Sequence, residues 1–295
     1  MNALDHLRLS SVLAVDSALF FDYGRFNPTH ATTNPSILLA AAQNSTYQHL
    51  LEQADTPLEL AVLFGAQILQ RIPGHVSIQL NPQFSFDTEA IIKEAHQCMT
   101  LCTKAHLPLD RVLLKIAATW EGIQAIKDLE RQGIRCNATM VLSLTQALKA
   151  SDVGATCIAP YVGRITDWYQ THSTSLEDMG VTTLSLIYHT LKKHGYQTRI
   201  MAASFRTPEQ ILALCGCDIL TISPKLLDAL LTLHSLASRK LSPHSSHLRA
   251  PLLSEKDFRW ELCNHPCASY LLDDGIRRFT KDSSTLENLL HTPLK

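Results

Sequence analysis

Residues 111–118 read RVLLKIAA, an almost unbroken apolar run that contains a single lysine, Lys115. A second run of the same kind, CDILTIS, occupies residues 217–223. Strands of a parallel sheet are buried on both faces, so they appear as continuous apolar runs and not as alternating ones. The two segments therefore predict buried parallel strands, with Lys115 as a charged residue inside one of them.

Outward from these two runs, short apolar segments alternate with longer helical patterns. The predicted strands are residues 11–16, 30–34, 75–80, 111–117, 136–142, 157–162, 198–203 and 218–223. The clearest helical patterns lie at residues 46–72, 87–105, 120–132, 174–194 and 208–215. Regular alternation of strand and helix predicts an α/β fold, a closed parallel (β/α)₈ TIM barrel.

The C-terminal part of the chain exceeds this eightfold alternation. Residues 236–251 are rich in Ser, His, Arg and Pro and predict an exposed loop. Helical patterns follow at residues 255–263, 266–279 and 284–291. We interpret residues 252–295 as a C-terminal helical extension packed on the barrel, and residues 1–295 as a single domain.

The bulk composition narrows the class of protein. The chain has 295 residues, 45% hydrophobic and 18% charged, with a formal net charge of -1. Without a basic patch, nucleic acid is not an expected partner, and an anionic ligand must be held by a few local cations. No apolar run is long enough to span a membrane, and the apolar stretch at residues 10–21 lacks a preceding basic region. These features predict a cytoplasmic protein.

Eight cysteines include three close pairs, which are Cys98 with Cys102, Cys215 with Cys217, and Cys263 with Cys267. None forms a CxxC motif or has a second pair at zinc-ribbon spacing. The pattern favours reduced thiols among apolar neighbours over a metal site. The closest approach to metal-ligand spacing, around His265, is a remote alternative.

Polar residues occur where the predicted strands end, which is where active sites of such barrels lie. They are Asp16, Asn34, Gln79, Asn137, Thr139, Tyr161, Arg164, Ser204 and Arg206. Together they offer a carboxylate, amides, hydroxyls and two guanidiniums. Arg164 and Arg206 could bind a phosphate through bidentate hydrogen bonds. Singly, each is explained as well by a helix cap or a surface ion pair.

Lys115 is the candidate nucleophile. Burial in an apolar strand favours the neutral amine, and a neutral amine attacks a ketone. The alternative is a structural lysine paired with Asp16 or Glu121, and the strand context alone leaves both readings open.

The chain resembles transaldolases along nearly its whole length. The resemblance is carried by ATTNPSILLAA (31–41), LLKIAATWEGIQAIKDLERQGIRCNATMVLS (113–143), APYVGRITDWYQ (159–170), MAASFRTPEQI (201–211), CDILTISPKLL (217–227) and DDGIRRFTKD (273–282). It implies a barrel with a C-terminal helical extension, a Schiff-base aldol mechanism of the pentose phosphate pathway, sugar-phosphate substrates, no metal or organic cofactor, and a homodimer.

The resemblance also implies a role for individual residues. Lys115 forms the imine with the ketose carbonyl, and Asp16 handles the proton of the C4 hydroxyl. The remaining implied assignments are substrate binding by Thr32, Asn34, Asn137 and Ala159, orientation of a catalytic water by Thr139, and phosphate binding by Arg164, Ser204 and Arg206.

Three positions depart from the transaldolase pattern. Gln79 stands where the family has a glutamate that works through water as an acid and base, and an amide cannot do this. Ala159 and Tyr161 replace the usual Ser and Phe. The related fructose-6-phosphate aldolases resemble this chain at all three positions. His30 is a lesser departure, because the family usually has Asp there.

From these departures we hypothesise that Tyr161 takes over the acid/base role, through a water held by Gln79 and Thr139. The enamine would then be protonated and hydrolysed, as in an aldolase, as well as transferred to an acceptor. One alternative is that Tyr161 is a tolerated replacement for Phe. Another is a catalytically weak barrel with a regulatory or scaffold role.

Overall fold

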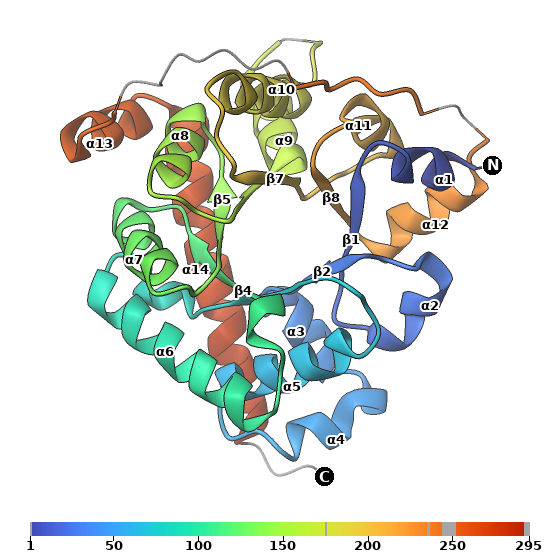
Figure 1. Cartoon of the computed structure of the whole chain (residues 1–295), viewed down its shortest axis with the longest axis vertical. Coiled ribbons are helices and arrows are strands. Elements are labelled where there is room, and N and C mark those ends of the chain that lie inside the picture. The colour runs from blue at the N-terminus through green and yellow to red at the C-terminus, as the bar shows by residue number, and fades with distance from the viewer. Residues whose placement is uncertain (1, 175, 235–236, 244–251, 292–295) are drawn as a thin grey trace.

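A computed structural model describes residues 2–174, 176–234, 237–243 and 252–291. Its eight strands form a closed barrel in sequence order, and every neighbouring pair is parallel (Figure 1). The strands are β1 (Val12–Asp16), β2 (His30–Thr32), β3 (Val76–Gln79), β4 (Val112–Ala117), β5 (Cys136–Val141), β6 (Cys157–Pro160), β7 (Arg199–Ala202) and β8 (Ile219–Ile222). The predicted (β/α)₈ barrel is confirmed.

Helices surround the barrel on its outer face (Figure 1). They are α1 (Ala3–Arg8), α2 (Tyr23–Phe26), α3 (Pro35–Ala42), α4 (Gln48–Leu51), α5 (Pro57–Leu69), α6 (Thr88–Lys104), α7 (Trp120–Arg131), α8 (Leu144–Asp152), α9 (Val162–His172), α10 (Met179–Lys193), α11 (Pro208–Ala213), α12 (Pro224–Thr232), α13 (Glu255–Cys263) and α14 (Pro266–Leu290). Short 3₁₀ turns lie at η1 (Phe20–Asp22), η2 (Ser45–Tyr47), η3 (Pro82–Phe84) and η4 (Leu109–Arg111).

The single helix predicted over residues 46–72 is wrong, because the chain breaks between α4 and α5. Thr56 caps α5 by accepting a hydrogen bond from the amide of Glu59 at 3.2 Å. Pro57 occupies the first helical position, where its missing N–H costs nothing and its ring disfavours helical geometry in the residue before it. The cap and the proline together start a new helix at this point.

Two further helix boundaries differ from the prediction. The segment predicted to begin at residue 174 begins at Met179, because Asp178 caps it through the amide of Val181 at 3.0 Å. The two C-terminal helices predicted at 266–279 and 284–291 are one continuous helix, α14. Ser283, Ser284 and Thr285 have weak helix propensity, but the packing of the buried face of α14 overrides it.

Helix α14 packs against α3, α9 and β5, and it runs diagonally behind the barrel in Figure 1. It thereby joins elements from opposite ends of the sequence.

Between α12 and α13, residues 237–243 contain no helix or strand, but Leu241 is buried and its amide donates to the carbonyl of Cys215 at 3.0 Å. The prediction of an exposed loop is therefore wrong at Leu241, whereas residues 236 and 244–251 lie outside the described residues. The single-domain assignment stays a prediction.

Inside the barrel, an apolar layer lies beneath the polar residues of the strand ends. It consists of Ala14, Leu113, Cys157, Met201 and Ile219.

Seven of the eight cysteines are buried, and only Cys263 is exposed. Within the described ranges, no helix is long and apolar enough to cross a membrane. The same ranges hold no group of three or more His, Cys, Asp or Glu placed to ligate a metal.

Candidate active site

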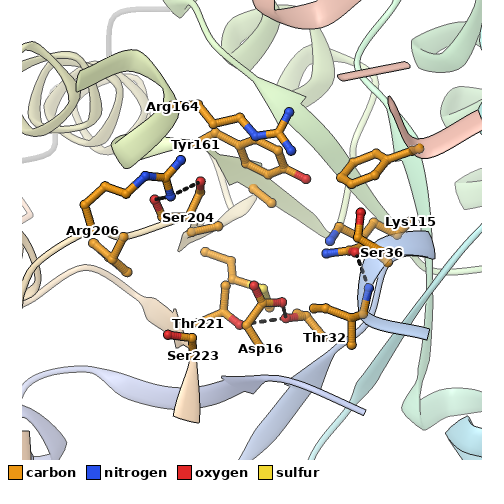
Figure 2. Close-up of a pocket in the computed structure, with 17 residues that line it drawn as sticks. Asp16, Thr32, Ser36, Lys115, Tyr161, Arg164, Ser204, Arg206, Thr221 and Ser223 are labelled. Atoms are coloured by element: carbon orange, nitrogen blue, oxygen red, sulfur yellow. Dashed lines mark hydrogen bonds between the residues drawn. The ribbon is translucent and has the colours of Figure 1, made fainter. Parts of the chain in front are cut away.

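A cavity of about 380 Å³ opens at the C-terminal ends of the strands (Figure 2). Nine of the residues predicted from the sequence line it, namely Asp16, Thr32, Asn34, Lys115, Ala159, Tyr161, Arg164, Ser204 and Arg206. Gln79, Asn137 and Thr139 lie beside it on neighbouring strands without lining it. The structure thus gathers side chains that are up to 190 residues apart in sequence, from Asp16 to Arg206.

Lys115 is the only lysine among the residues that line this cavity, and its side chain is 4% exposed. Its Nζ donates to the carbonyl oxygen of Thr33 at 3.3 Å. Among the described residues it forms no ion pair, and Glu121 pairs with Arg259 instead. Lys115 is therefore not held in an ion pair with Asp16 or Glu121, as the structural alternative required. A buried amine held by one carbonyl is available to a carbonyl carbon in the cavity.

Asp16, at the end of β1, accepts a hydrogen bond from Thr32 Oγ1 to Oδ1 at 2.6 Å (Figure 2). Thr32 Oγ1 lies 2.7 Å from Thr221 Oγ1, so Thr221 donates to Thr32 in turn. Burial raises the pKa of Asp16, while the charge of Lys115 and the Thr32 hydrogen bond oppose that rise. A carboxyl that holds its proton to higher pH is suited to general acid and base chemistry.

Gln79, Lys115 and Asn137 stand side by side on β3, β4 and β5. Asn137 donates through Nδ2 to Ser77 Oγ at 3.2 Å. Its Oδ1 and Gln79 Oε1 are both buried, and neither has a hydrogen-bond partner in the described part of the chain. Buried amide oxygens are normally satisfied, so these two mark places for a water molecule or a ligand hydroxyl.

Tyr161 follows β6 and is 5% exposed. Its hydroxyl lies 3.0 Å from Thr139 Oγ1 on β5. The guanidinium of Arg164, on α9, lies over the Tyr161 ring at 5.3 Å and over the Phe279 ring at the same distance. The position of the phenol is therefore fixed by two contacts, one from Thr139 to its hydroxyl and one from the Arg164 guanidinium to the face of its ring.

Two arginines stand at the end of the cavity away from Lys115 (Figure 2). Arg206 donates to Asp167 Oδ2 through Nε at 2.9 Å and Nη2 at 2.8 Å. Its Nη1 donates to the carbonyl and the hydroxyl of Ser204 at 2.9 and 3.2 Å. Arg164 forms no ion pair within the described residues. The alternative that these arginines form surface ion pairs therefore holds in part for Arg206, which pairs with Asp167. It does not hold for Arg164 in the described part of the chain.

The backbone around these arginines is unusual. Ser204 has φ of 64°, in the left-handed region that a non-glycine residue rarely adopts. Gly163 leaves no room for a side chain, because a Cβ there would meet the Ser204 carbonyl at 2.1 Å. The close approach of α9 to the end of β7 therefore requires glycine at 163.

Asn34 both caps a helix and lines the cavity. Its Oδ1 caps α3 by accepting from the amide of Ile37 at 3.0 Å, as the helix-cap alternative expected. The residue also lines the cavity, so the two readings hold together.

Some lining residues were not found from the sequence, among them Ser36, Thr221, Ser223 and Phe279. Thr221 and Ser223 carried a signal, since both are polar residues within the apolar run at 217–223. Phe279 carried none, because it reaches the cavity only through the path of α14. Ser36 is bonded to Asp282 of the same helix, so α3 and α14 meet at the rim.

Comparison with known proteins agrees with this geometry. The family model "Transaldolase/Fructose-6-phosphate aldolase" matches residues 4–290. Transaldolase from Bos taurus is 42% identical, covering 98% of this chain and 93% of its own length. Transaldolase from Homo sapiens is 41% identical over the same shares, and Transaldolase 2 from Salmonella choleraesuis is 41% identical over all of both chains. The chain belongs to the transaldolase/fructose-6-phosphate aldolase family.

Proposed function

We propose that this enzyme cleaves fructose 6-phosphate or sedoheptulose 7-phosphate through a Schiff base on Lys115, and passes the dihydroxyacetone unit to an acceptor aldose phosphate or to water. The observation that carries the proposal is the buried Lys115 amine, which pairs with no carboxylate in the described part of the chain and faces the same cavity as Asp16. The two guanidiniums at the far end of that cavity supply the phosphate contacts.

The steps follow from the positions of these groups. The amine of Lys115 adds to the C2 carbonyl of the ketose, and the carbonyl oxygen leaves as water to give a protonated imine. Asp16 then accepts the proton of the C4 hydroxyl while the C3–C4 bond breaks, and the bonding electrons move into the imine as an enamine. The aldose phosphate leaves, and the three-carbon enamine stays on the lysine.

Two fates are open to the enamine. Attack on the aldehyde of an acceptor, with the proton returned from Asp16, completes a transfer. Protonation at carbon followed by water attack releases dihydroxyacetone and regenerates the amine. Both fates need a group that moves protons to and from water beside Lys115.

We assign that role to Tyr161, because the amide of Gln79 has no exchangeable acidic proton near neutrality. The contact between Tyr161 and Thr139, and the unpartnered Oε1 of Gln79 on β3, support a water bound between these strands. Gln79, Ala159 and Tyr161 together favour a share of acceptor-independent aldolase turnover. A regulatory or scaffold role has less support, since nine of the predicted site residues share one cavity. The homodimer and the cytoplasmic location stay predictions from the sequence.

Trapping tests the covalent step. The enzyme is incubated with fructose 6-phosphate and borohydride, and the reduced adduct is mapped by mass spectrometry. We expect it on Lys115, and none in Lys115→Arg. An adduct elsewhere, or none in the wild type, contradicts the mechanism.

The fate of the enamine is tested separately. Release of glyceraldehyde 3-phosphate is measured with and without erythrose 4-phosphate. We expect faster release with the acceptor and measurable release without it. If release depends wholly on the acceptor, the enzyme is a transferase only and the aldolase part of the proposal is wrong.

A further inference from the structure

The opposite, N-terminal mouth of the barrel has a polar cluster of its own, which we call the basal cluster. It consists of His30, His75, Arg135 and Arg199, which begin or immediately precede β2, β3, β5 and β7. Side chains alternate along a strand, so a residue points to the same side as the one two positions later. Two positions later stand Thr32, Ser77, Asn137 and Met201, which contact one another or the cavity inside the barrel. The basal cluster therefore faces the barrel interior.

The basal cluster is separate from the site of Lys115. The apolar layer that includes Leu113, Cys157 and Met201 lies between the two along the strands. On β4, for example, Leu113 precedes Lys115 by two positions, and on β7 Arg199 precedes Met201 in the same way. A ligand at the basal cluster would not touch the catalytic groups.

His30 places a hydrogen-bond donor opposite the Arg199 guanidinium in this cluster. It is 5% exposed, and its Nδ1 accepts a hydrogen bond from the amide of His75 at 2.9 Å. Burial and the nearby charges lower the pKa of His30 to about 4, so at neutral pH the ring is neutral with one proton. Since Nδ1 is an acceptor, that proton is on Nε2. Yet Nε2 lies 3.5 Å from Nη1 of Arg199, which is also a donor.

His30 is buried and Arg199 is partly buried, and an acceptor between or beside their two facing donors would satisfy both. Glycine at 74 permits this close approach, because a Cβ there would come within 2.1 Å of His30 Nδ1, and the ring is held by the hydrogen bond from the His75 amide at 2.9 Å. The imidazole therefore cannot turn to offer Arg199 a lone pair without losing its contact with the backbone.

The charge around His30 is positive. The His75 ring lies 5.0 Å from the His30 ring, and its Nε2 lies 3.3 Å from Nη1 of Arg135. Neither Arg135 nor Arg199 forms an ion pair with any carboxylate that the structure describes. Among the described residues, the hydrogen-bond partners of Arg135 are His75 and the carbonyl of Asp110, the latter at 3.0 Å. Two unpaired guanidiniums thus flank two imidazoles.

Other charged groups lie nearby, and one of them is Glu130, which interacts with the charge of Arg135 and accepts hydrogen bonds from the amides of Cys136 and Thr156. Arg111 adds a third positive charge, although its donors are used by the carbonyls of Gly74, Leu69 and Ile72. Asp110 is the carboxylate that faces His75 and opposes the lowering of its pKa. Asp218, at the start of β8, is paired with Lys192 at 2.7 Å.

We propose that the basal cluster is an anion-binding site that takes a small tetrahedral oxyanion of the phosphate class between His30 Nε2 and the Arg199 guanidinium, with Arg135 as the second cation. Such an anion supplies the acceptor that His30 and Arg199 lack, and guanidinium–oxyanion hydrogen bonds are among the stronger ones in proteins. The site is independent of the Lys115 chemistry. A ligand that binds only the folded barrel stabilises it by mass action.

Histidine NMR tests the proposal directly. The full chain is titrated with inorganic phosphate at constant ionic strength, set with chloride, and the Cε1–H resonance of His30 is assigned from His30→Gln. We expect a saturable shift of the His30 and His75 resonances, and a rise in the pKa of His30 when phosphate is bound. Sulfate titrated in parallel shows whether any tetrahedral oxyanion suffices, and a phosphate monoester shows whether an ester is accepted.

Variants separate this site from the catalytic cavity. Arg199→Gln should raise the midpoint of the His30 shift at least about tenfold, as expected for loss of a charge-assisted contact. Arg206→Gln, in the cavity at the other end, should leave that midpoint unchanged even if it abolishes turnover. Arg135→Gln, at an exposed position, gives a smaller rise and serves if Arg199→Gln does not fold. A shift that is linear in phosphate, or a midpoint that is unchanged in a folded Arg199→Gln or Arg135→Gln, overturns the proposal.

Discussion

The hydroxyl of Tyr161 and Oγ1 of Thr139 lie 3.0 Å apart, and this contact joins the end of β6 to β5 beside the strand that carries Lys115. The same phenol ring packs beneath the guanidinium of Arg164. In the proposed mechanism, proton transfer and phosphate binding therefore meet at Tyr161, and removing its hydroxyl alone should affect only proton transfer.

Tyr161→Phe keeps the ring and removes the proton carrier. Acceptor-independent release should fall by about 10²-fold, the usual contribution of a general acid or base. Imine formation, measured by the rate of borohydride trapping on Lys115, should slow much less than release, because protonation of the enamine carbon belongs only to the release pathway. Tyr188→Phe, a buried tyrosine on α10, is the control. Equal losses in the two steps would mean that the hydroxyl is structural.

Gln79→Glu places a carboxyl next to Lys115 on the neighbouring strand. A carboxyl can exchange a proton with a bound water, so the enamine should be handled more as in transaldolases. We expect the ratio of release with erythrose 4-phosphate to release without it to rise about tenfold. Gln79→Met keeps the side-chain length without a carboxyl and should not raise the ratio. An unchanged ratio in Gln79→Glu would show that position 79 does not set the fate of the enamine.

Asp167→Asn tests the competition for Arg206. Two of the Arg206 donors are directed at one carboxylate oxygen, and both residues are about half exposed, with side chains 42% and 50% accessible. An amide competes less well than a carboxylate with a bound phosphate, so KM for fructose 6-phosphate should fall, by only a few-fold because the pair is solvated. Asp274→Asn, which removes the partner of Arg278 in an adjacent groove, should leave KM as it is. A higher KM in Asp167→Asn would instead assign Asp167 to holding Arg206 in place.

Glu94→Gln tests a buried carboxyl behind Gln79. Glu94 accepts a hydrogen bond from the amide of Asn81 at 2.8 Å, and burial raises its pKa from 4.5 to about 7. The folded chain therefore holds this proton more tightly than the unfolded chain. Its contribution to stability is complete below pH 4.5 and is lost as the pH rises through 7.

Glutamine mimics the protonated acid at every pH, so the effect of Glu94→Gln should depend on pH. Its free energy of unfolding should match the wild type near pH 4.5 and exceed it by about 1–3 kcal/mol at pH 8. Chemical denaturation at the two pH values measures this. Glu89→Gln, exposed on the same helix, should show no such difference. A variant less stable than the wild type at pH 8 would show that Glu94 stays ionised in the fold.

The strand ends were the part of the site that the sequence revealed. Asp16 and Lys115 interrupt apolar runs, and buried strands leave few reasons for a charge, so both stand out in the sequence alone. The same rule found Arg206 but could not show that Asp167 holds it. Hydrogen bonds between residues far apart in sequence depend on how α9 approaches β7, which no local pattern encodes.

Helix boundaries and the cavity wall were predicted less well, for two different reasons. The break before Pro57 was local and could have been read from Thr56 and Pro57, where a cap precedes proline. The place of Phe279 was not local, because α14 spans 25 residues and its packing partners α3 and α9 decide which face meets the cavity. Periodicity finds an amphipathic helix, but it does not say what the apolar face will cover.

Helix α14 also determines the order in which the parts of the cavity can assemble during synthesis. A nascent chain that has emerged from the ribosome as far as α13 already possesses all eight strands, Lys115 and Asp16. It still lacks Phe279 and the Asp282 carboxylate that binds Ser36, so one wall of the substrate cavity is open to water. The wall of the cavity is therefore complete only after α14 has folded against the barrel.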